Sequence, residues 1–584
     1  MLQRATAVPS SRSDPQNWTP KHLCNLSTSA VPVLHTDLGT AAMAFWDFIQ
    51  SDEGRLVLWG TFARGVALVY AISFASLSTQ ITAWPGKHGI APVGARLQQF
   101  SRVYFPQLSG DGERTKRRTS ACSRAALYVR RFCSRPTLLW LVGWADGTMW
   151  AITACGFTLS ALLLVGGWSW STTCILFAAT WFLYLSLDVA FGLAYPWDSL
   201  LLSVGFLLIF SPPLQAAGFT VASLGVVQLP DPQLCFLVRW LLARLLLGFG
   251  KLKFMGTGAH HHCYIRGFLV SQPMPTKFGW LAHHLPLAVH KFALGGMFVV
   301  EILLPPLFFV GGTCRVVAAV SAALLMVGIQ LTGNFGYFNL LTTAVAVAVM
   351  DPVSAYELPG YSSMAASVLD PATYAGGLGC VFNVSRHHVL AVLVPAMVFG
   401  SLIVFLFNSW VNLSWLHWPA IGRTRTGFWG HYLSTLRSLS PWRVLNAFGV
   451  FPPKSQPPLR WVVIMEGSQD GGASWKEYHW KYMTSGPGDS PAAAPRCVAP
   501  HHPRIDHRCD AVLCAARLPL CFVSSHEVGC ATHVRLVSAA YSTLRLEQRT
   551  RTCCRASRRA TPLCSRHMLA PHTAWRTACC VDSR

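Results

Sequence analysis

The sequence predicts an all-α polytopic membrane protein with about five to nine transmembrane helices and a small β-rich C-terminal luminal region. Of its 584 residues, 52% are hydrophobic and only 12% are charged, whereas soluble domains carry about 25% charged residues. The mean hydropathy of +0.38 indicates the same class. The apolar residues also gather in runs of roughly 17 to 25, the length that crosses the hydrocarbon core of a bilayer.

Nine apolar segments are candidate membrane spans. They lie near residues 56–78, 149–168, 171–193, 198–217, 233–250, 293–311, 315–332, 335–350 and 387–409. Pro196 separates the third segment from the fourth, so these two are alternatively one re-entrant unit. The segment at 335–350 is short enough to lie at the membrane interface instead.

The N-terminal residues 1–45 are polar and are expected to be disordered. They lack the apolar core of a signal peptide, so the first span is expected to act as the signal anchor. Asn17 and Asn25 each begin an Asn-X-Ser/Thr triplet and are candidate glycosylation acceptors. Glycosylation there requires a luminal N-terminus.

The net charge of +23 is distributed unevenly. Between the first two spans lie Arg114, Lys116, Arg117, Arg118, Arg124, Arg130 and Arg131. Such loops usually stay cytoplasmic, which orients the first span from lumen to cytosol. Nucleic-acid binding is the rival explanation, but the charge flanks membrane segments and forms no recognisable module. We therefore expect the lipid bilayer as a partner and no nucleic acid.

Past residue 350 the composition changes twice. A multi-span domain (56–350) is followed by a loop (351–386) rich in Ser, Ala and Gly, the last helix (387–409), and a luminal region (410–507). In that region Trp461–Met465 is typical of an apolar strand, and Asp470-Gly-Gly472 is typical of a turn. Large side chains then alternate over Trp475–Trp480, which favours a hairpin in a small β domain.

The last segment, 508–584, differs from the rest of the chain. It holds twelve Arg, no Lys, four acidic residues and nine of the nineteen Cys, without helical or strand periodicity. A disulfide-rich luminal tail and a zinc module are alternatives, although no paired CxxC spacing occurs. The preferred hypothesis is an aberrant tail, translated out of frame or through an intron. An uninterrupted, abundant transcript across codons 500–520 would overturn that hypothesis.

Short motifs in a fixed order carry a resemblance to a known family. They include Ser73-Phe-Ala-Ser-Leu-Ser-Thr-Gln80, Gly89-Ile-Ala-Pro92, Pro136-Thr-Leu-Leu-Trp140, Tyr195-Pro-Trp-Asp-Ser-Leu-Leu201, Phe236-Leu-Val-Arg-Trp-Leu-Leu-Ala-Arg244, Gln272-Pro-Met-Pro275, Ala282-His-His-Leu-Pro286, Glu301-Ile-Leu-Leu-Pro-Pro306, Thr332-Gly-Asn-Phe-Gly-Tyr-Phe-Asn339, Glu466-Gly-Ser-Gln-Asp-Gly471 and Pro503-Arg-Ile-Asp506. Over about residues 56–507, the chain resembles the lipase maturation factors.

The resemblance implies a protein of the endoplasmic reticulum membrane, and the Asn17 and Asn25 triplets and the apolar runs add the expectation of a multi-pass glycoprotein. It implies a chaperone-like factor that folds, assembles and matures secreted dimeric lipases, with lipase-like client proteins as partners and no hydrolase activity of its own. The chain departs from the family at Gly256–Cys263, where the family has a Trp-rich segment, and after Asp506. The second departure implies a truncated luminal region.

Several polar residues stand out within or beside the apolar runs. The candidate functional or structural residues are Trp197, Asp198, Arg239, Arg244, Lys251, Gln272, His283, His284, Glu301, Asn334 and Asn339. An ionisable group at membrane depth costs roughly 2.5–3.5 kcal/mol on insertion scales, so it usually faces a partner or a cavity. These residues either line a polar pocket or serve folding by pairing with one another, with Arg239 alternatively reaching an interface.

The histidines near this region do not form a metal motif. His260, His261 and His262 are adjacent, as are His283 and His284, and adjacent helical positions point about 100° apart. No HExxH motif accompanies them, so loop histidines near the interface are expected. Asn334 and Asn339 are expected to satisfy hydrogen bonds at a helix end.

The motifs that the chain lacks argue against catalysis. The body contains no GxSxG elbow, no P-loop or dinucleotide fingerprint, and no CxxC before the tail. We therefore expect neither an enzyme nor a cofactor or metal. The alternative is a membrane-embedded enzyme related to the membrane domain of vitamin-K-dependent carboxylases, with Arg239, Lys251 or His283 as the basic catalytic residue. A transporter would predict internal repeats, and none is visible.

Overall fold

The structure is a computed structural model of the chain. It describes residues 37–89, 91–108, 121–193, 195–215, 229–256, 264–270, 276–352, 389–390, 392–406, 439–446, 448, 459–468, 474, 476–478 and 533–542. Helix α1 (Asp37–Gln50) crosses the boundary between an N-terminal unit, residues 1–48, and the main unit, residues 49–584, and is described by itself.

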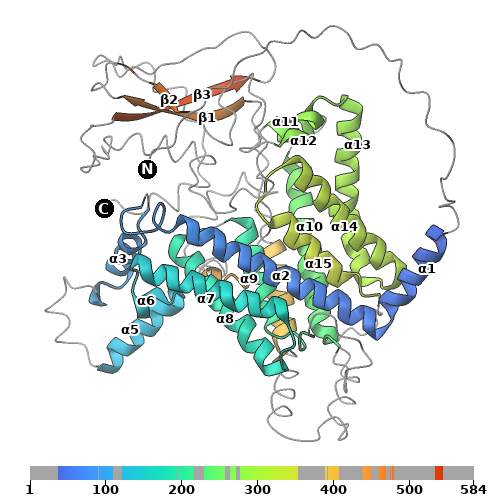
Figure 1. The fold of residues 1–584 in the computed structure, drawn as a ribbon, viewed down its shortest axis with the longest axis horizontal. Helices are drawn as coiled ribbons and strands as arrows, with labels where there is room; N and C mark the ends of the chain where they lie inside the picture. Colours follow the sequence, from blue (N-terminus) through green and yellow to red (C-terminus); the bar gives the residue numbers. More distant parts are fainter. Residues whose placement is uncertain are drawn as a thin grey trace, which may run out of the picture. The chain divides into compact units, whose positions relative to one another are not determined.

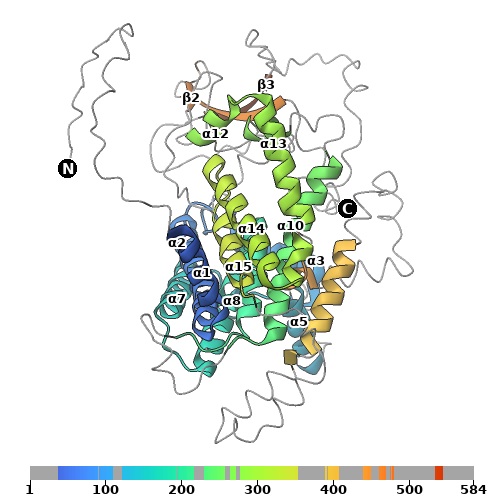
Figure 2. The same cartoon turned by 90° about the vertical axis from the view of Figure 1, so that its right-hand side faces the viewer.

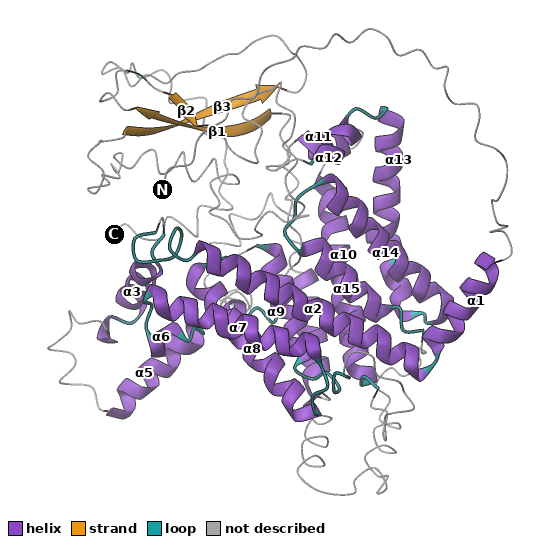
Figure 3. Cartoon of the chain, viewed as in Figure 1, coloured by secondary structure: helices purple, strands orange, loops and turns teal. Residues whose placement is uncertain are grey.

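The main unit is built mostly from helices (Figures 1 and 3). In chain order they are α2 (Asp52–Gln80), α3 (Val93–Tyr104), α5 (Ala121–Ser134), α6 (Leu139–Val142), α7 (Asp146–Val165), α8 (Trp170–Phe191), α9 (Pro196–Leu208), α10 (Pro232–Gly256), α11 (Tyr264–Val270), α12 (Lys277–His283), α13 (Leu287–Phe298), α14 (Gly312–Thr332) and α15 (Phe338–Val349). Short 3₁₀ turns occupy Pro106–Leu108, Pro305–Phe309 and Ser440–Trp442.

Six helices in the described part of the chain are long and apolar enough to cross a membrane. They are Asp52–Gln80, Asp146–Val165, Trp170–Phe191, Pro232–Lys251, Leu287–Phe309 and Gly312–Thr332. Three predicted spans correspond to shorter apolar helices, namely Pro196–Leu208, Phe338–Val349 and Val392–Leu406. The prediction of a mostly helical, multi-pass membrane protein is therefore confirmed.

Local chemistry explains where several helices begin and end. Ser51 caps α2, because its hydroxyl accepts a hydrogen bond from the Gly54 amide at 3.0 Å. Helix α8 ends at Gly192, whose φ of +61° is the left-handed conformation that glycine adopts without strain. Pro196 then begins α9, a position where its missing amide hydrogen costs nothing. The predicted spans 171–193 and 198–217 are thus two separate helices.

The helix that begins at Leu287 changes its winding in the middle. It is α-helical to Phe298, π-helical over Val299–Leu303 and 3₁₀ over Pro305–Phe309. Pro305 and Pro306 have no amide hydrogens and cannot continue α-helical hydrogen bonding, which accounts for the change. Single π-turns inside α-helices are frequent at functional sites, and this one contains Glu301.

Helix α2 packs against α7, α9 and α15, and small residues permit the close approach. Figure 2 shows α7 and α15 close to α2. A Cβ placed on Gly156 of α7 would lie 2.3 Å from the Phe74 ring of α2. A Cβ on Gly205 of α9 would lie 1.9 Å from the Tyr70 hydroxyl. Helices in a bilayer associate mainly through such packing, since lipid tails remove the hydrophobic driving force between them.

Beyond the helices, three strands form one antiparallel sheet in the order β2-β1-β3. β1 (Leu459–Ser468) pairs with β2 (Lys476–Tyr478) and, along its whole length, with β3 (His533–Ser542). β3 lies in the segment 508–584, where the sequence shows no strand periodicity. The wider luminal β-rich region stays a prediction.

Candidate functional site

The ionisable residues of the membrane helices form a set of buried polar contacts rather than one open pocket. Asp198 is fully buried in the first turn of α9. Its Oδ1 atom accepts hydrogen bonds from the Tyr184 hydroxyl at 2.5 Å and the Tyr337 hydroxyl at 2.7 Å. The two hydroxyls are themselves 2.8 Å apart. One carboxylate thereby joins α8, α9 and the loop that leads into α15.

The Trp197 side chain packs beside Asp198 through contacts between aromatic rings. Its ring stacks on Tyr195, with 4.4 Å between centroids and 11° between planes, and lies edge-on to Tyr337 at 6.3 Å. The Tyr-Pro-Trp-Asp motif thus supplies the acceptor and part of its packing in consecutive residues. The two tyrosines that donate to Asp198 lie 14 and 139 residues away, and no local pattern predicted them.

Glu301 forms the second contact, an ion pair with Lys253 of α10. Both side chains are buried, and the Lys253 ammonium also lies 3.5 Å from the Met297 sulfur. The sequence predicts Glu301 as a candidate but misses Lys253. The predicted span ended at residue 250, whereas α10 continues to Gly256, so that Lys253 lies on the helix in a buried position.

Lys251 and Arg244 lie on the same helix with different neighbours. The Lys251 ammonium is 4.0 Å from the centroid of the Phe405 ring and donates to the Phe405 carbonyl at 3.3 Å. Arg244 donates to the Asn446 carbonyl at 3.1 Å and lies 5.1 Å from the Phe448 ring centroid. Arg239 is buried one turn earlier, where it interacts electrostatically with Cys235 and Arg315. In the contacts named here, Lys251 and Arg244 therefore meet backbone carbonyls and aromatic rings and not another candidate residue.

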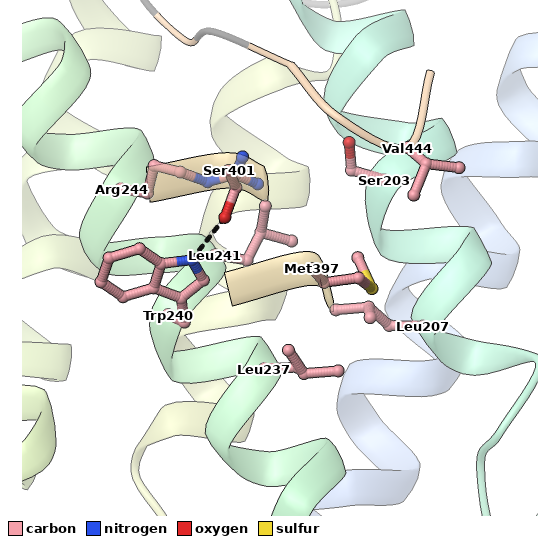
Figure 4. A pocket seen from close by; sticks show the side chains of 9 residues that line it. All are labelled: Ser203, Leu207, Leu237, Trp240, Leu241, Arg244, Met397, Ser401 and Val444. Carbon is pink, nitrogen blue, oxygen red and sulfur yellow. Dashed lines mark hydrogen bonds between the residues drawn. The ribbon is translucent and has the colours of Figure 1, made fainter. Parts of the chain in front are cut away.

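A small cavity lies beside Arg244 (Figure 4). Its lining comprises Ser203, Leu207, Leu237, Trp240, Leu241, Arg244, Met397, Ser401 and Val444. The Trp240 indole donates to the Ser401 hydroxyl across it at 2.7 Å. The cavity measures about 10 Å³, which is close to the space that one water molecule needs. Small-molecule sites occupy about 300–1,000 Å³, so this cavity is a packing feature.

Two histidines near α12, the candidate His284 and also His290, contact backbone carbonyls. His284 Nδ1 lies 2.8 Å from the Trp280 carbonyl, and His290 Nε2 lies 2.9 Å from the Ala282 carbonyl. Burial, with the nearby charge of Arg266, lowers the pKa of His283 below its ordinary value. Within the described residues, no three His, Cys, Asp or Glu side chains gather as a metal site.

The structure describes two of the remaining candidates, Asn339 and Asn334, and leaves the others outside the described residues. Asn339, near the start of α15, donates to the Gln330 side chain at 2.9 Å, while Asn334 lies in the loop before that helix. Outside the described residues are Gln272, His260, His261, His262, Asn17 and Asn25.

A third set of contacts, missed by the sequence analysis, ties residues 439–446 to the helices. Arg443 Nε donates to Asp188 Oδ2 of α8 at 2.7 Å, and the Trp442 indole donates to the Cys133 carbonyl at 3.1 Å. Asn446 donates to the Ser203 hydroxyl at 2.7 Å. The Asp188 carboxylate raises the pKa of Arg443 above its usual value. The partners are 243 to 309 residues apart, beyond the reach of any local signal.

Replacing Asp198 with leucine should destabilise the helices more than removing an ordinary buried hydrogen bond. The change removes the acceptor that two buried tyrosine hydroxyls share and leaves them only their other hydrogen bonds, including the one between them. An unsatisfied buried polar group costs about 1–3 kcal/mol. Thermal unfolding in detergent would measure the loss. Tyr70→Phe is the matched control, because the Tyr70 hydroxyl is equally buried but donates to a single backbone carbonyl. Equal effects of the two variants would contradict the role given to Asp198.

Comparison with known proteins identifies the relatives of the chain. Residues 59–356 match the model of the lipase maturation factor transmembrane domain. The chain is 28% identical to lipase maturation factor 2 of Homo sapiens, over 76% of this chain and 70% of that protein. It is 26% identical to lipase maturation factor 1 of Bos taurus, over 76% of this chain and 72% of that protein. No solved structure matches the chain significantly.

Proposed function

The chain belongs to the lipase maturation factor family, and from this premise we propose that it matures secreted dimeric lipases from the endoplasmic reticulum membrane. It would act as a chaperone-like glycoprotein that assists folding and assembly of its clients. The single observation that carries the proposal is the family match over residues 59–356, which contains five of the six long apolar helices and most of the first, Asp52–Gln80.

The buried polar contacts favour a scaffold over a catalyst. Asp198 is held by two tyrosines, Glu301 by Lys253, and Arg244 by the Asn446 carbonyl. Ionisable groups are costly at membrane depth, and pairing with protein groups offsets that cost. Because these side chains bind other parts of the same chain, they support a structural role in holding the helices together.

The three candidates for an enzymatic base lie in separate surroundings. Lys251 contacts Phe405, Arg239 lies near Cys235 and Arg315, and His283 interacts with Arg266. Alanine substitution separates the two functions. An enzyme should lose activity through one of these residues without loss of protein, whereas a folding factor should lose activity gradually as its stability falls.

The function is tested by expressing the chain in cells that lack their own lipase maturation factors but make a secreted dimeric lipase. We expect lipase activity in the medium to rise, with immature lipase recovered alongside the tagged chain from microsomes. Absence of both, with the chain correctly inserted in the membrane, would contradict the proposal. Turnover of a small molecule by the purified protein would favour the enzyme instead.

Deleting residues 459–507 should abolish client activation while leaving membrane insertion intact. The reason is that this region, which contains β1 and β2, is proposed to hold the client while it dimerises. Secreted lipase activity and resistance to carbonate extraction measure the two properties. A Gly/Ser segment of equal length in place of 459–507 controls for the length of the tether, and full activation by that variant would reject the role.

A further inference from the structure

Helix α5 (Ala121–Ser134) carries apolar residues on one face and basic residues on the other. Apolar residues at spacings of three, four and seven share a helix face, because a turn takes about 3.6 residues. Ala125, Tyr128, Val129 and Phe132 have this spacing, whereas Ser123, Arg124, Arg130 and Arg131 lie around the other side. No Asp or Glu occurs within α5, so the helix carries only positive charge.

The last turn of α5 lies against α8, a candidate membrane span (Trp170–Phe191). The Phe132 ring centroid is 6.2 Å from that of Phe182 in α8. Just beyond α5, the Leu138 amide donates to the Ser186 hydroxyl of the same span at 2.9 Å. Phe182 lies nine residues before the end of α8, which is roughly 13 Å into the span at about 1.5 Å per residue. The last turn of α5 is therefore at membrane depth.

The rest of the apolar face of α5 is exposed. Tyr128 and Val129, one turn before Phe132, are 51% and 62% exposed, and Ala125, a turn earlier, is exposed as well. Phe132 itself meets both α8 and Trp442, so the exposed residues continue a surface that begins on a membrane helix. Because apolar surface is more stable outside water, lipid is the cover that this position offers.

The arginines of α5 differ in their surroundings along the helix. Arg131, in the last turn, lies 4.2 Å from the Trp140 ring centroid and 5.1 Å from that of Tyr128, so aromatic faces stabilise its charge. Arg124 and Arg130 are exposed. A basic helix with apolar and aromatic residues on its other face lies in the plane of the membrane interface, and anionic lipid strengthens its binding.

We propose that α5 is an interfacial helix that binds the lipid surface beside α8. Ala125, Tyr128 and Val129 insert among the acyl chains, while Arg124 and Arg130 contact the anionic groups of lipid heads. The guanidinium fork of arginine matches a phosphate with two hydrogen bonds, and each phospholipid head supplies a phosphate. Both faces of α5 then find a partner in the same bilayer.

Lipid contact at α5 has a consequence for residues 439–446. The Trp442 indole donates to the Cys133 carbonyl of α5 at 3.1 Å, and the Trp442 and Phe132 ring centroids are 6.3 Å apart. Residues 439–446 therefore meet a helix whose position depends on the membrane.

Fluorescent probes on the two faces of α5 test the lipid contact in the full chain. Dansylalanine replaces either Ala125 or Ser123 by amber suppression, which leaves the nineteen native cysteines unlabelled. Ala125 and Ser123 are both exposed and lie on opposite sides of the helix, so each is the control for the other. The purified protein is placed in nanodiscs of phosphatidylcholine mixed with phosphatidylserine. Brominated acyl chains quench a probe among lipid, and iodide quenches a probe in water.

We expect brominated lipid to quench the probe at position 125 and iodide to quench the probe at position 123. Quenching of both probes by iodide alone would overturn the proposal. Protection of the probe at position 125 from both quenchers would also overturn it, because a protein segment or a second copy of the chain then covers the apolar face.

The role of the two exposed arginines is tested with the same probe. Replacing phosphatidylserine by phosphatidylcholine should lower the quenching by brominated lipid at position 125. Arg124→Gln combined with Arg130→Gln should remove this dependence on anionic lipid, whereas Arg102→Gln, at an exposed arginine of α3, should keep it. No dependence in the unsubstituted helix, or an equal dependence in the double variant, would overturn the contact between these arginines and anionic lipid heads.

Discussion

Replacing Lys253 with methionine should sharply reduce the folded protein, because it leaves the buried Glu301 carboxylate without its cation. Removing one partner of a buried ion pair typically costs about 3–5 kcal/mol. That is a large share of the total stability of a typical domain, about 5–15 kcal/mol. Size-exclusion chromatography of the tagged protein in detergent, with its thermal unfolding midpoint, measures the loss.

The double variant Lys253→Met with Glu301→Leu separates the pair from its surroundings. A buried pair can often be replaced by apolar residues at little cost, so the double variant should recover much of the stability that the single variant loses. Lys291→Met is the matched control, because Lys291 belongs to α13 but is exposed. The ion pair would lose its assigned importance if Lys253→Met behaved like Lys291→Met, or if the double variant were no better than the single one.

Replacing Arg443 with methionine should release residues 439–446 from the helices and lower the unfolding midpoint. Asp188 is fully buried, and the loss of its charged partner again costs about 3–5 kcal/mol in a buried setting. Limited proteolysis should show faster cleavage between residues 407 and 458, and thermal unfolding should show the loss of stability.

Two further variants make the Arg443 result specific. Arg443→Met combined with Asp188→Asn also removes the carboxylate charge that Arg443 neutralised, and it should regain part of the stability. Arg130→Met removes an exposed arginine of α5 and should change neither readout. Unchanged proteolysis in Arg443→Met would show that Trp442 and Asn446 hold the segment without the ion pair.

The same ion pair links the fold to the proposed function. Residues 439–446 precede the sheet in the chain, and they contact α5, α8 and α9. A client-binding region beyond residue 459 would depend on this attachment to keep a fixed relation to the membrane helices. Replacing Arg443 should therefore reduce client activation while the helices still insert in the membrane.

Most of the fold follows from the sequence, while most of the site does not. The apolar runs predict the six long helices, because bilayer thickness sets their length. The sequence also predicts that Asp198 and Glu301 contact polar partners inside the protein, since an isolated charge at membrane depth is costly. Their actual partners, Tyr184, Tyr337 and Lys253, were not predicted, since sequence spacing does not specify a contact between helices.

The sequence alone determined the membrane class, the helix positions and the family, because these depend on the length and local order of residues. Only the tertiary structure decided which buried groups pair and which face of α5 stays exposed. Lys253 and Glu301 meet across 48 residues, and Arg443 and Asp188 across 255. Such pairs are selected by the three-dimensional packing of helices, in which a buried charge must find an opposite charge or a hydrogen bond to offset its loss of solvation.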